Sequence, residues 1–232
     1  MLIMNFIYFS NKITKKCNKI LHIIFFFLIK KPLYTLSYNN NGNRFVCKGF
    51  IIKSSLIING KNNQIFIDKG VRLNNMKIVI SGNNNRLIIH KGVIFHEGGR
   101  VKLEDDNNLI EIGEKTDIVN CFFAVSDCNS KITIGSESML SAQIVIRNSD
   151  AHSILNKEGK RINHAKDTII GKRVWVGYGA TILKGSYIED DCIIGTQSVV
   201  AGLQMPQGSI AAGNPAKIVK EGIKWNRQRL KN

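Results

Sequence analysis

The sequence predicts an all-β solenoid, a parallel β-helix in which short strands and corners alternate. Three features support this prediction: aliphatic residues recur every six positions, a small or short side chain precedes each by two positions, and glycine follows several of them. The pattern is clearest in residues 168–204. Its aliphatic positions are Ile170, Val176, Ile182, Ile188, Ile194 and Val200.

A period of six fits neither an amphipathic helix nor a single long strand. It fits a chain that makes a short strand, turns a corner and repeats, so that three steps complete one coil above the last. Each aliphatic residue then points into a triangular prism. Small side chains such as Ala180 fit beside it where the prism narrows, and glycines such as Gly171, Gly177 and Gly195 permit the corner dihedrals.

Residues 39–146 repeat on a longer period. Their reference positions, which lie 21, 22, 23 and 22 residues apart, are Val46, Ile67, Ile89, Ile112 and Ile134. The sixfold step continues inside these coils at Leu73, Val79, Phe95, Val101, Ile118, Ala124, Leu140 and Ile146. Each coil therefore has extra residues at one corner, where Asn and Gly tolerate the left-handed conformation. We expect about seven coils in one continuous domain, residues 39–204, with the long corners stacked along one edge.

The sixfold register breaks once, between Ile146 and Ile170. The intervening residues 147–167 are polar and far too numerous for a corner, so we expect them to leave the prism as an extended loop. A long ordered loop in a rigid repeat is usually functional. The loop is therefore where we expect the chemistry.

The two ends differ from the coils. Residues 1–38 contain the apolar run 20–29 between basic residues. This run is too short to cross a bilayer, which takes about 20 residues, and no signal-peptide cleavage site follows it. We expect a helical segment that either packs on the end of the prism or contacts the inner membrane surface through residues 12–31.

Residues 205–232 are predicted to form a loop and a short helix. A turn after Gly213 precedes a basic stretch in which Ile218, Ile223 and Leu230 would face inward. We expect this helix to cap the C-terminal end of the prism.

Charge and cysteine content narrow the possible partners and the compartment. The formal net charge of +16 favours an anionic partner: the phosphates of a nucleotide, an acidic polysaccharide or a membrane surface. A lysine-rich solvated face is the alternative explanation. Nucleic acid is not expected, because no aromatic-rich basic motif accompanies the charge. The five cysteines have no CxxC spacing, which favours reduced thiols in a cytoplasmic protein without a zinc site.

The segments RNSDAHSI, RINHAKDTIIGKRVWVGYGATILKGSYI and SIAAGNPAKIVK occur in this order within residues 146–220. They resemble the hexapeptide-repeat acyltransferases, and most closely the bacterial capsule and O-antigen polysaccharide O-acetyltransferases. The resemblance implies a left-handed β-helix, acetyl-CoA as the donor, and a homotrimer in which each active site is built from two chains.

Acetyl transfer to a hydroxyl needs a base that titrates near neutrality and lies within hydrogen-bond reach of that hydroxyl. His152 in the long loop meets this description, and the resemblance implies the same role for it. Asp150, two residues earlier, could orient the imidazole, contact the sugar or be a solvated carboxylate. Trp175 offers a flat ring to a sugar or to the pantetheine arm, and the resemblance places a tryptophan beside the active centre. Burial under the loop or at a subunit contact is the alternative for Trp175.

The donor site is inferred from the resemblance. It implies contacts of acetyl-CoA with Tyr178, Thr196 and Ala201, and contacts of its phosphates with Lys217 and Lys220. Ammonium groups suit phosphates, which independently supports the two lysines.

The other histidines give no metal site in this interpretation. His164 in the loop is either a second polar contact or an incidental residue, and we favour the latter; His90 and His96 are expected on the outside of adjacent walls. Their spacing does not match the three converging histidines of metal-binding β-helix enzymes, so we expect no metal.

The function that these features predict is acetyl-CoA-dependent O-acetylation of a sugar hydroxyl in a bacterial capsular or O-antigen polysaccharide. Transfer would be direct, because no serine or cysteine stands in an activated pairing. Three alternatives stay open: an N-acetyltransferase of an amino sugar nucleotide, a non-catalytic β-helix protein that binds polysaccharide or membrane, and a metal-dependent hydratase.

Overall fold

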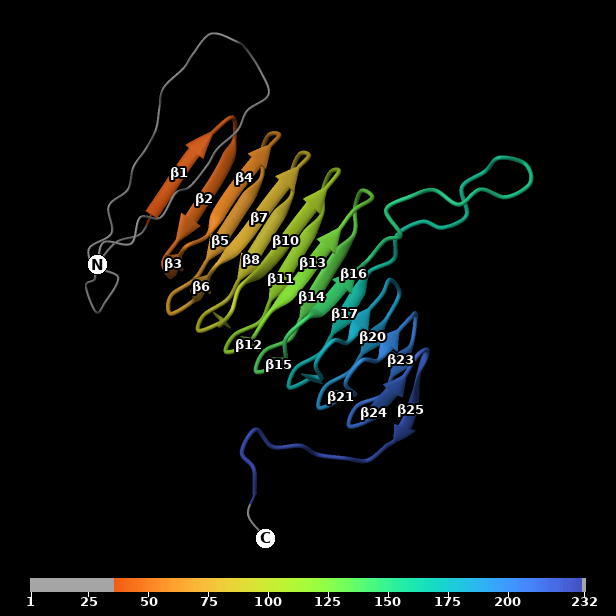
Figure 1. Cartoon of the computed structure of the whole chain (residues 1–232). Coiled ribbons are helices and arrows are strands. Elements are labelled where there is room, and N and C mark those ends of the chain that lie inside the picture. The colour runs from red at the N-terminus through yellow and green to blue at the C-terminus, as the bar shows by residue number, and fades with distance from the viewer. Residues whose placement is uncertain (1–35, 231–232) are drawn as a thin grey trace.

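A computed structural model describes residues 36–230, which form a parallel β-solenoid with three sheets (Figure 1). Sheet 1 contains β1 (Leu36–Asn40), β2 (Asn43–Cys47), β5 (Gln64–Ile67), β8 (Arg86–Ile89), β11 (Leu109–Ile112), β14 (Lys131–Ile134), β17 (Thr168–Ile170), β20 (Tyr187–Ile188) and β23 (Gln204–Met205). Sheet 2 contains β3 (Phe50–Ile52), β6 (Arg72–Asn74), β9 (Ile94–Phe95), β12 (Asp117–Ile118), β15 (Met139–Leu140), β18 (Trp175–Val176), β21 (Ile193–Ile194), β24 (Ile210–Gly213) and β25 (Ala216–Lys220). Sheet 3 contains β4 (Ser55–Asn59), β7 (Met76–Ser81), β10 (Gly99–Glu104), β13 (Cys121–Val125), β16 (Ile144–Arg147), β19 (Thr181–Ile182) and β22 (Val199–Val200).

Each coil visits sheets 1, 2 and 3 in turn, and the predicted solenoid of about seven coils is confirmed. Neighbouring strands pair in parallel within each sheet, except for β1–β2 and β24–β25 at the two ends. We refer to the corners as 1–2, 2–3 and 3–1, after the sheets that they join. Corner 3–1 therefore lies across the prism from sheet 2.

The core is a stack of aliphatic residues, and every predicted core position of residues 168–204 is buried. Three earlier positions are wrong by one residue: Cys47, Ile78 and Phe123 are buried in place of Val46, Val79 and Ala124. The step from sheet 2 to sheet 3 takes five residues in two of these coils, as from Leu73 to Ile78, so a strict count of six overshoots. A one-residue shift in a strand moves a side chain to the opposite face.

Corner 3–1 contains the extra residues, as predicted, and it holds a ladder of buried amides. Asn62, Asn84, Asn107 and Asn129 adopt positive φ there. A second set of asparagines, which the sequence analysis did not separate from the first, is buried. The Oδ1 atoms of Asn63 and Asn85 accept the N–H groups of Asn85 and Asn108, one coil further on, at 2.9 Å in both cases. The ladder satisfies polar backbone groups that would otherwise be buried without partners.

Glycine serves a different purpose from the one expected at Gly171, Gly177 and Gly195, because none of these has a positive φ. A Cβ on Gly177 would lie 2.7 Å from the backbone N of Thr196 in the next coil. Close approach between successive coils, and not an unusual dihedral angle, therefore requires glycine at this corner.

The predicted C-terminal helix is wrong, since β25 pairs antiparallel with β24. The last strand of sheet 2 would otherwise leave its backbone groups unpaired at an edge. The chain then runs back along corner 1–2, and Leu230 is 72% exposed instead of facing inward. The predicted N-terminal helix and its membrane contact lie almost wholly in residues 1–35, outside the described residues. In the part that is described, no helix has the length and apolarity to cross a membrane.

Candidate active site

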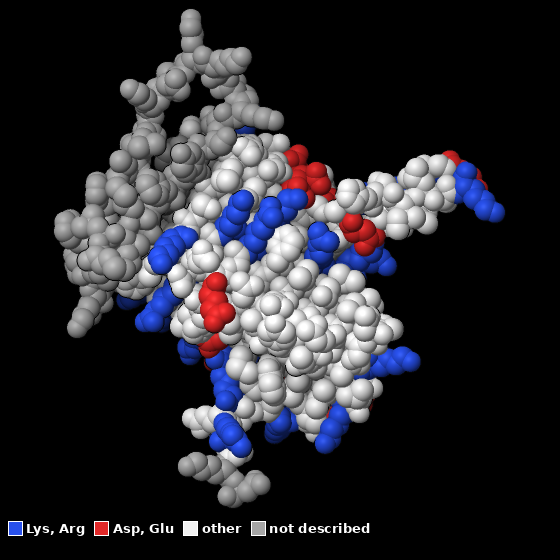
Figure 2. Space-filling view, viewed as in Figure 1, with Lys and Arg blue, Asp and Glu red and all other residues white. Residues whose placement is uncertain are grey.

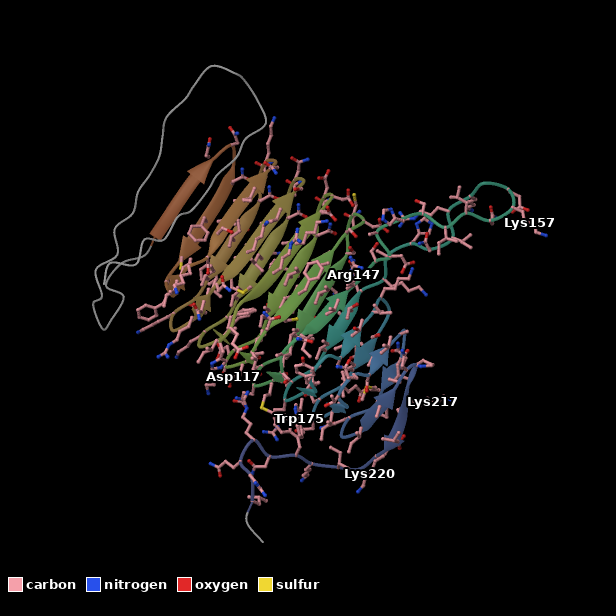
Figure 3. The ribbon with its side chains drawn as sticks, in the orientation of Figure 1. Asp117, Arg147, Lys157, Trp175, Lys217 and Lys220 are labelled. Carbon is pink, nitrogen blue, oxygen red and sulfur yellow. The ribbon has the colours of Figure 1, made fainter. Side chains whose placement is uncertain are left out.

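The long loop leaves the solenoid between β16 and β17 and protrudes from corner 3–1, as predicted (Figure 1). Its outer half is a hairpin in which the Ile162 N–H donates to the Ile154 carbonyl at 2.9 Å and the Asn156 N–H donates to the Lys160 carbonyl at 2.9 Å. Lys157 lies at its tip (Figure 3). The loop is therefore an ordered arm whose position depends on the contacts at its base.

Asp127, in the preceding coil, holds one side of this base. Arg161 donates to both of its carboxylate oxygens, at 3.1 and 2.7 Å, and the Ala165 N–H donates to Oδ2 at 3.0 Å. Partial burial would raise the pKa of Asp127, but the hydrogen bonds from Arg161 and Ala165 outweigh it, so the pKa is lowered. The carboxylate stays ionised and anchors the returning half of the loop to the coil.

Asn163 joins the two halves of the loop. Its Nδ2 donates to the backbone O of His152 at 2.7 Å and to Oδ2 of Asp150 at 2.8 Å, while its Oδ1 accepts the Ile154 N–H at 2.7 Å. Lys184, from corner 3–1 of the next coil, forms an ion pair with Asp150. The hydrogen bond from Lys184 lowers the pKa of Asp150 and, with the help of the Asn163 amide, outweighs the opposing effect of partial burial. The side chain of Asp150 is thus directed to Lys184 and Asn163.

His152 follows a tight turn in which Ala151 has a φ of 65° and its N–H donates to Oγ of Ser149 at 3.1 Å. The backbone of His152 is fixed by Asn163, but its side chain is exposed. No hydrogen bond among the described residues involves the imidazole. The ring is therefore available to a molecule outside its own chain.

Trp175 lies on the outer face of β18 in sheet 2, so it is on the side of the prism opposite the loop. It is 39% exposed, and its ring centroid is 6.0 Å from that of Trp225 in the C-terminal tail. Trp225 in turn donates from Nε1 to the Arg173 carbonyl at 2.6 Å. Within one chain, the structure therefore does not bring Trp175 to His152.

The predicted donor residues are distributed over two corners and one strand. Tyr178 and Thr196 lie one coil apart at corner 2–3, whereas Ala201 lies at corner 3–1. Lys217 and Lys220 are exposed on β25, which is separated from β18 by β21 and β24 in sheet 2, and they are far from the tip of the loop (Figure 3). All five are on the surface, but no single groove of one chain collects them.

Among the residues that the structure describes, the other histidines lie at the surface, and His90 and His96 are on the outside as expected. His90 Nε2 is 2.6 Å from Oε1 of Glu111, and His96 Nε2 is 3.4 Å from Oδ1 of Asp117. His164 is exposed beside Asp127. The described residues contain no group of three or more side chains placed to hold a metal ion.

Comparison with known proteins defines the family. Residues 167–202 match the family model described as "Bacterial transferase hexapeptide (six repeats)". The chain is 38% identical to the polysialic acid O-acetyltransferase of Neisseria meningitidis, over 75% of this chain and 80% of that protein. It is 37% identical to the polysialic acid O-acetyltransferase of Escherichia coli O1:K1 / APEC, over 57% of this chain but only 44% of that protein.

The solved structures agree with this. The polysialic acid O-acetyltransferase OatWY superposes with a TM-score of 0.77 at 34% identity, covering 82% of this chain and 90% of that chain. The chain belongs to the hexapeptide-repeat acyltransferases. Another polysialic-acid-specific acetyltransferase, NeuO, superposes with a TM-score of 0.72 at 35% identity, covering 82% of this chain and 87% of that chain.

Sequence analysis missed the four residues that fix the loop in this hexapeptide-repeat acyltransferase: Asp127, Arg161, Asn163 and Lys184. Asp127, Arg161 and Lys184 act through partners 34 positions away, whereas the partners of Asn163 lie 9 to 13 positions away within the loop. The repeat pattern gives no indication of such pairs. The one available indication was that the loop contains a cation and an amide close to its return to the coil.

Proposed function

We propose that this acyltransferase transfers the acetyl group of acetyl-CoA to a hydroxyl of a capsular polysaccharide. The observation that carries the proposal is the His152 imidazole, which stands exposed on a backbone fixed by Asn163 and is left for an external ligand. The names of the relatives, polysialic acid O-acetyltransferases from two bacteria, support a capsular acceptor and a hydroxyl as its reacting group.

In the proposed mechanism, the imidazole of His152 takes the proton of the acceptor hydroxyl as that oxygen attacks the thioester carbonyl. The tetrahedral intermediate then collapses, the C–S bond breaks, and the imidazolium returns the proton to the leaving thiolate. The products are the O-acetyl sugar and coenzyme A. No acyl-enzyme is required, which agrees with the absence of an activated nucleophile in the sequence.

We infer that the working unit is a homotrimer in which each site combines two protomers. The support is geometric: His152 protrudes at corner 3–1, while Trp175 is on sheet 2 and Tyr178 and Thr196 are at corner 2–3. A heterologous contact that closes into a ring would place the arm of one protomer against the other surface of the next. Acetyl-CoA would lie between protomers, with its phosphates near Lys217 and Lys220. We place the reaction in the cytoplasm, because the four cysteines of the described residues are free thiols.

Mass spectrometry of polysaccharide incubated with enzyme and acetyl-CoA tests the proposed reaction. Wild-type enzyme should add acetyl groups to polysialic acid but not to an amino sugar nucleotide, and His152→Ala should abolish the addition. His164→Ala, an exposed histidine of the same loop, is the matched control and should keep full activity. Acetylation of the amino sugar alone, or full activity of His152→Ala, would refute the proposal.

A second experiment tests the assembly. Trimers refolded from a mixture of His152→Ala and Trp175→Ala chains should regain activity, because about a quarter of the sites would combine an intact His152 with an intact Trp175 from the next chain. If the two variants remain inactive together, one chain must supply both residues.

A further inference from the structure

The outer face of sheet 3 carries a group of cations on adjacent strands. Lys77 of β7 is in register with Arg100 of β10, and Arg100 is in register with Phe122 of β13. Two residues further along β10, Lys102 lies beside the small Ala124 of β13, and Arg147 of β16 lies on the other side of Ala124. We call Lys77, Arg100, Lys102 and Arg147 the cationic row. Because strands in a sheet are about 4.8 Å apart, the row extends for about 14 Å along the solenoid axis.

An aromatic ring holds two of these cations in place. The guanidinium carbons of Arg100 and Arg147 are 5.5 and 5.8 Å from the ring centroid of Phe122, within the range of a cation–π interaction. Neither arginine takes part in an ion pair with any described residue, whereas Lys102 is paired with Glu104 at 2.6 Å. The two guanidinium groups are therefore ordered but not neutralised.

The row leads directly to the proposed catalytic loop. Arg147 is the last residue of β16, and the loop begins immediately after it. Asn148 follows as a buried anchor whose Nδ2 donates to Oγ of Ser130 at 2.6 Å, so the direction of the chain is fixed at this point. Figure 3 shows Arg147 near the base of the loop, and Figure 2 shows Lys and Arg side chains gathered across this face up to the loop.

We propose that the cationic row binds an anionic polysaccharide and guides it to His152. The inference rests on the proposed function and adds the class of acceptor: a polymer that carries repeated carboxylates, rather than a monomer or a neutral glycan. Guanidinium groups match carboxylates with paired hydrogen bonds, and the face of Phe122 suits the apolar side of a sugar ring. A small ligand would touch one or two of these cations, whereas a polyanion contacts charges repeated over several coils.

Steady-state kinetics of the double variant Arg100→Gln/Arg147→Gln tests the row, with sialic acid polymers of graded length as acceptors. We expect KM for long polymers to rise at least tenfold, with little change in kcat or in KM for acetyl-CoA. KM for the shortest accepted oligomer should change much less. Added salt should raise KM for long polymers more steeply in the wild type than in the variant, because the variant makes fewer charge contacts with the polymer for salt to screen.

The matched control is Arg44→Gln/Arg86→Gln, which removes the same charge from exposed positions of sheet 1. Its KM should not depend on polymer length more than that of the wild type. An equal rise in KM for both double variants would show that only net charge matters, and an unchanged KM for Arg100→Gln/Arg147→Gln would place the acceptor elsewhere. Either result would overturn the proposal.

Direct binding separates this proposal from the proposed function. Calorimetric titration with polysialic acid in the absence of acetyl-CoA should show binding to wild-type enzyme and to His152→Ala, but at least tenfold weaker binding to Arg100→Gln/Arg147→Gln. Binding without acetylation would refute the proposed reaction while supporting the row. Acetylation by the wild type, with equal binding of polysialic acid by all variants, would support the proposed reaction and refute the role of the cationic row. If the double variant does not fold, Lys77→Gln on the exposed end of the row should show the same effect to a smaller extent.

Discussion

Asn163 controls the position of His152, and its replacement by alanine should loosen the loop without destabilising the coils. The substitution removes three short hydrogen bonds, to the backbone O of His152, to Asp150 and from the Ile154 N–H. At about 0.5–1.5 kcal/mol net for each bond, the loop loses about 1.5–4.5 kcal/mol of local stability. Local opening of the loop should then be roughly 10-fold to 2,000-fold more frequent.

Hydrogen exchange followed by mass spectrometry measures this directly. Amides of residues 150–165 should exchange faster in Asn163→Ala by that factor, while amides of β14 and β17 should not change. The thermal midpoint of the solenoid should fall by no more than about 2 °C, since the loop lies outside the cooperative core. Acetyl transfer should decrease mainly in kcat, because within residues 36–230 no hydrogen bond holds the imidazole itself and its position depends on the backbone bond to Asn163.

Asn156→Ala at the tip of the same loop is the control. Its Oδ1 accepts the Lys160 N–H at 2.8 Å, so its loss should affect only the tip of the hairpin. Equal exchange in Asn163→Ala and wild type would show that Asp127, Arg161 and Lys184 suffice to hold the loop. A large drop in the thermal midpoint would show that loop and coils unfold together, which would refute the reasoning.

Three further predictions concern the coil and the base of the loop. Asn85→Ala leaves the buried Asn108 N–H without its partner and removes the hydrogen bond to the Asp105 carbonyl, so it should cost about 1.5–4.5 kcal/mol in chemical denaturation; a loss under about 1 kcal/mol would mean that water replaces the amide. Gly177→Ala puts a Cβ 2.7 Å from a backbone nitrogen of the next coil and should cost about 1–3 kcal/mol, seen as a lower thermal midpoint, whereas an unchanged midpoint would show that the corner has room. Because the pKa of Asp127 is lower in the folded chain than its ordinary value of 3.8, its contacts with the loop should stabilise the loop base at all pH values above 3.8 and be lost only as the pH falls through the lower folded value. Exchange of the loop base, corrected for intrinsic rates, should therefore stay constant down to pH 3.8 and rise below it, and a rise near neutral pH would contradict this.

The coil could be predicted from the sequence because its determinants are local and repeated. An aliphatic residue every six positions has only one arrangement that buries all of them, so residues such as Ile170 and Val200 were assigned correctly. The errors at Val79 and Ala124 arose where a coil shortens one step by a residue, which no count of a fixed period detects. The expected C-terminal helix failed because the free edge of β24 offers the chain hydrogen bonds that local helix propensity does not take into account.

The site was predictable only in part. The loop and His152 follow from a break in the repeat together with the chemistry of imidazole. Lys184 could not be found in the same way, because its ion pair with Asp150 exists only after the coils have stacked, and the contacts of Asn163 depend on how the loop folds back on itself. The separation of His152 from Trp175 was equally invisible, since a linear sequence does not show that corner 3–1 and sheet 2 lie on opposite sides of the prism.

The architecture separates the stability of this enzyme from the placement of its proposed base. Interior strands are hydrogen-bonded on both sides by neighbouring coils, so the coils stabilise one another cooperatively. The loop, in contrast, is held at its base by a few polar contacts of Asp127, Asn163 and Lys184, whose partners are accessible to water. Substitutions at the loop base should therefore change catalysis with little effect on unfolding, whereas substitutions in the amide ladder should do the opposite. A polymeric acceptor gives a physical reason for this arrangement, because a rigid face can bind a long chain in register while a separately anchored arm brings the base to one of its hydroxyls.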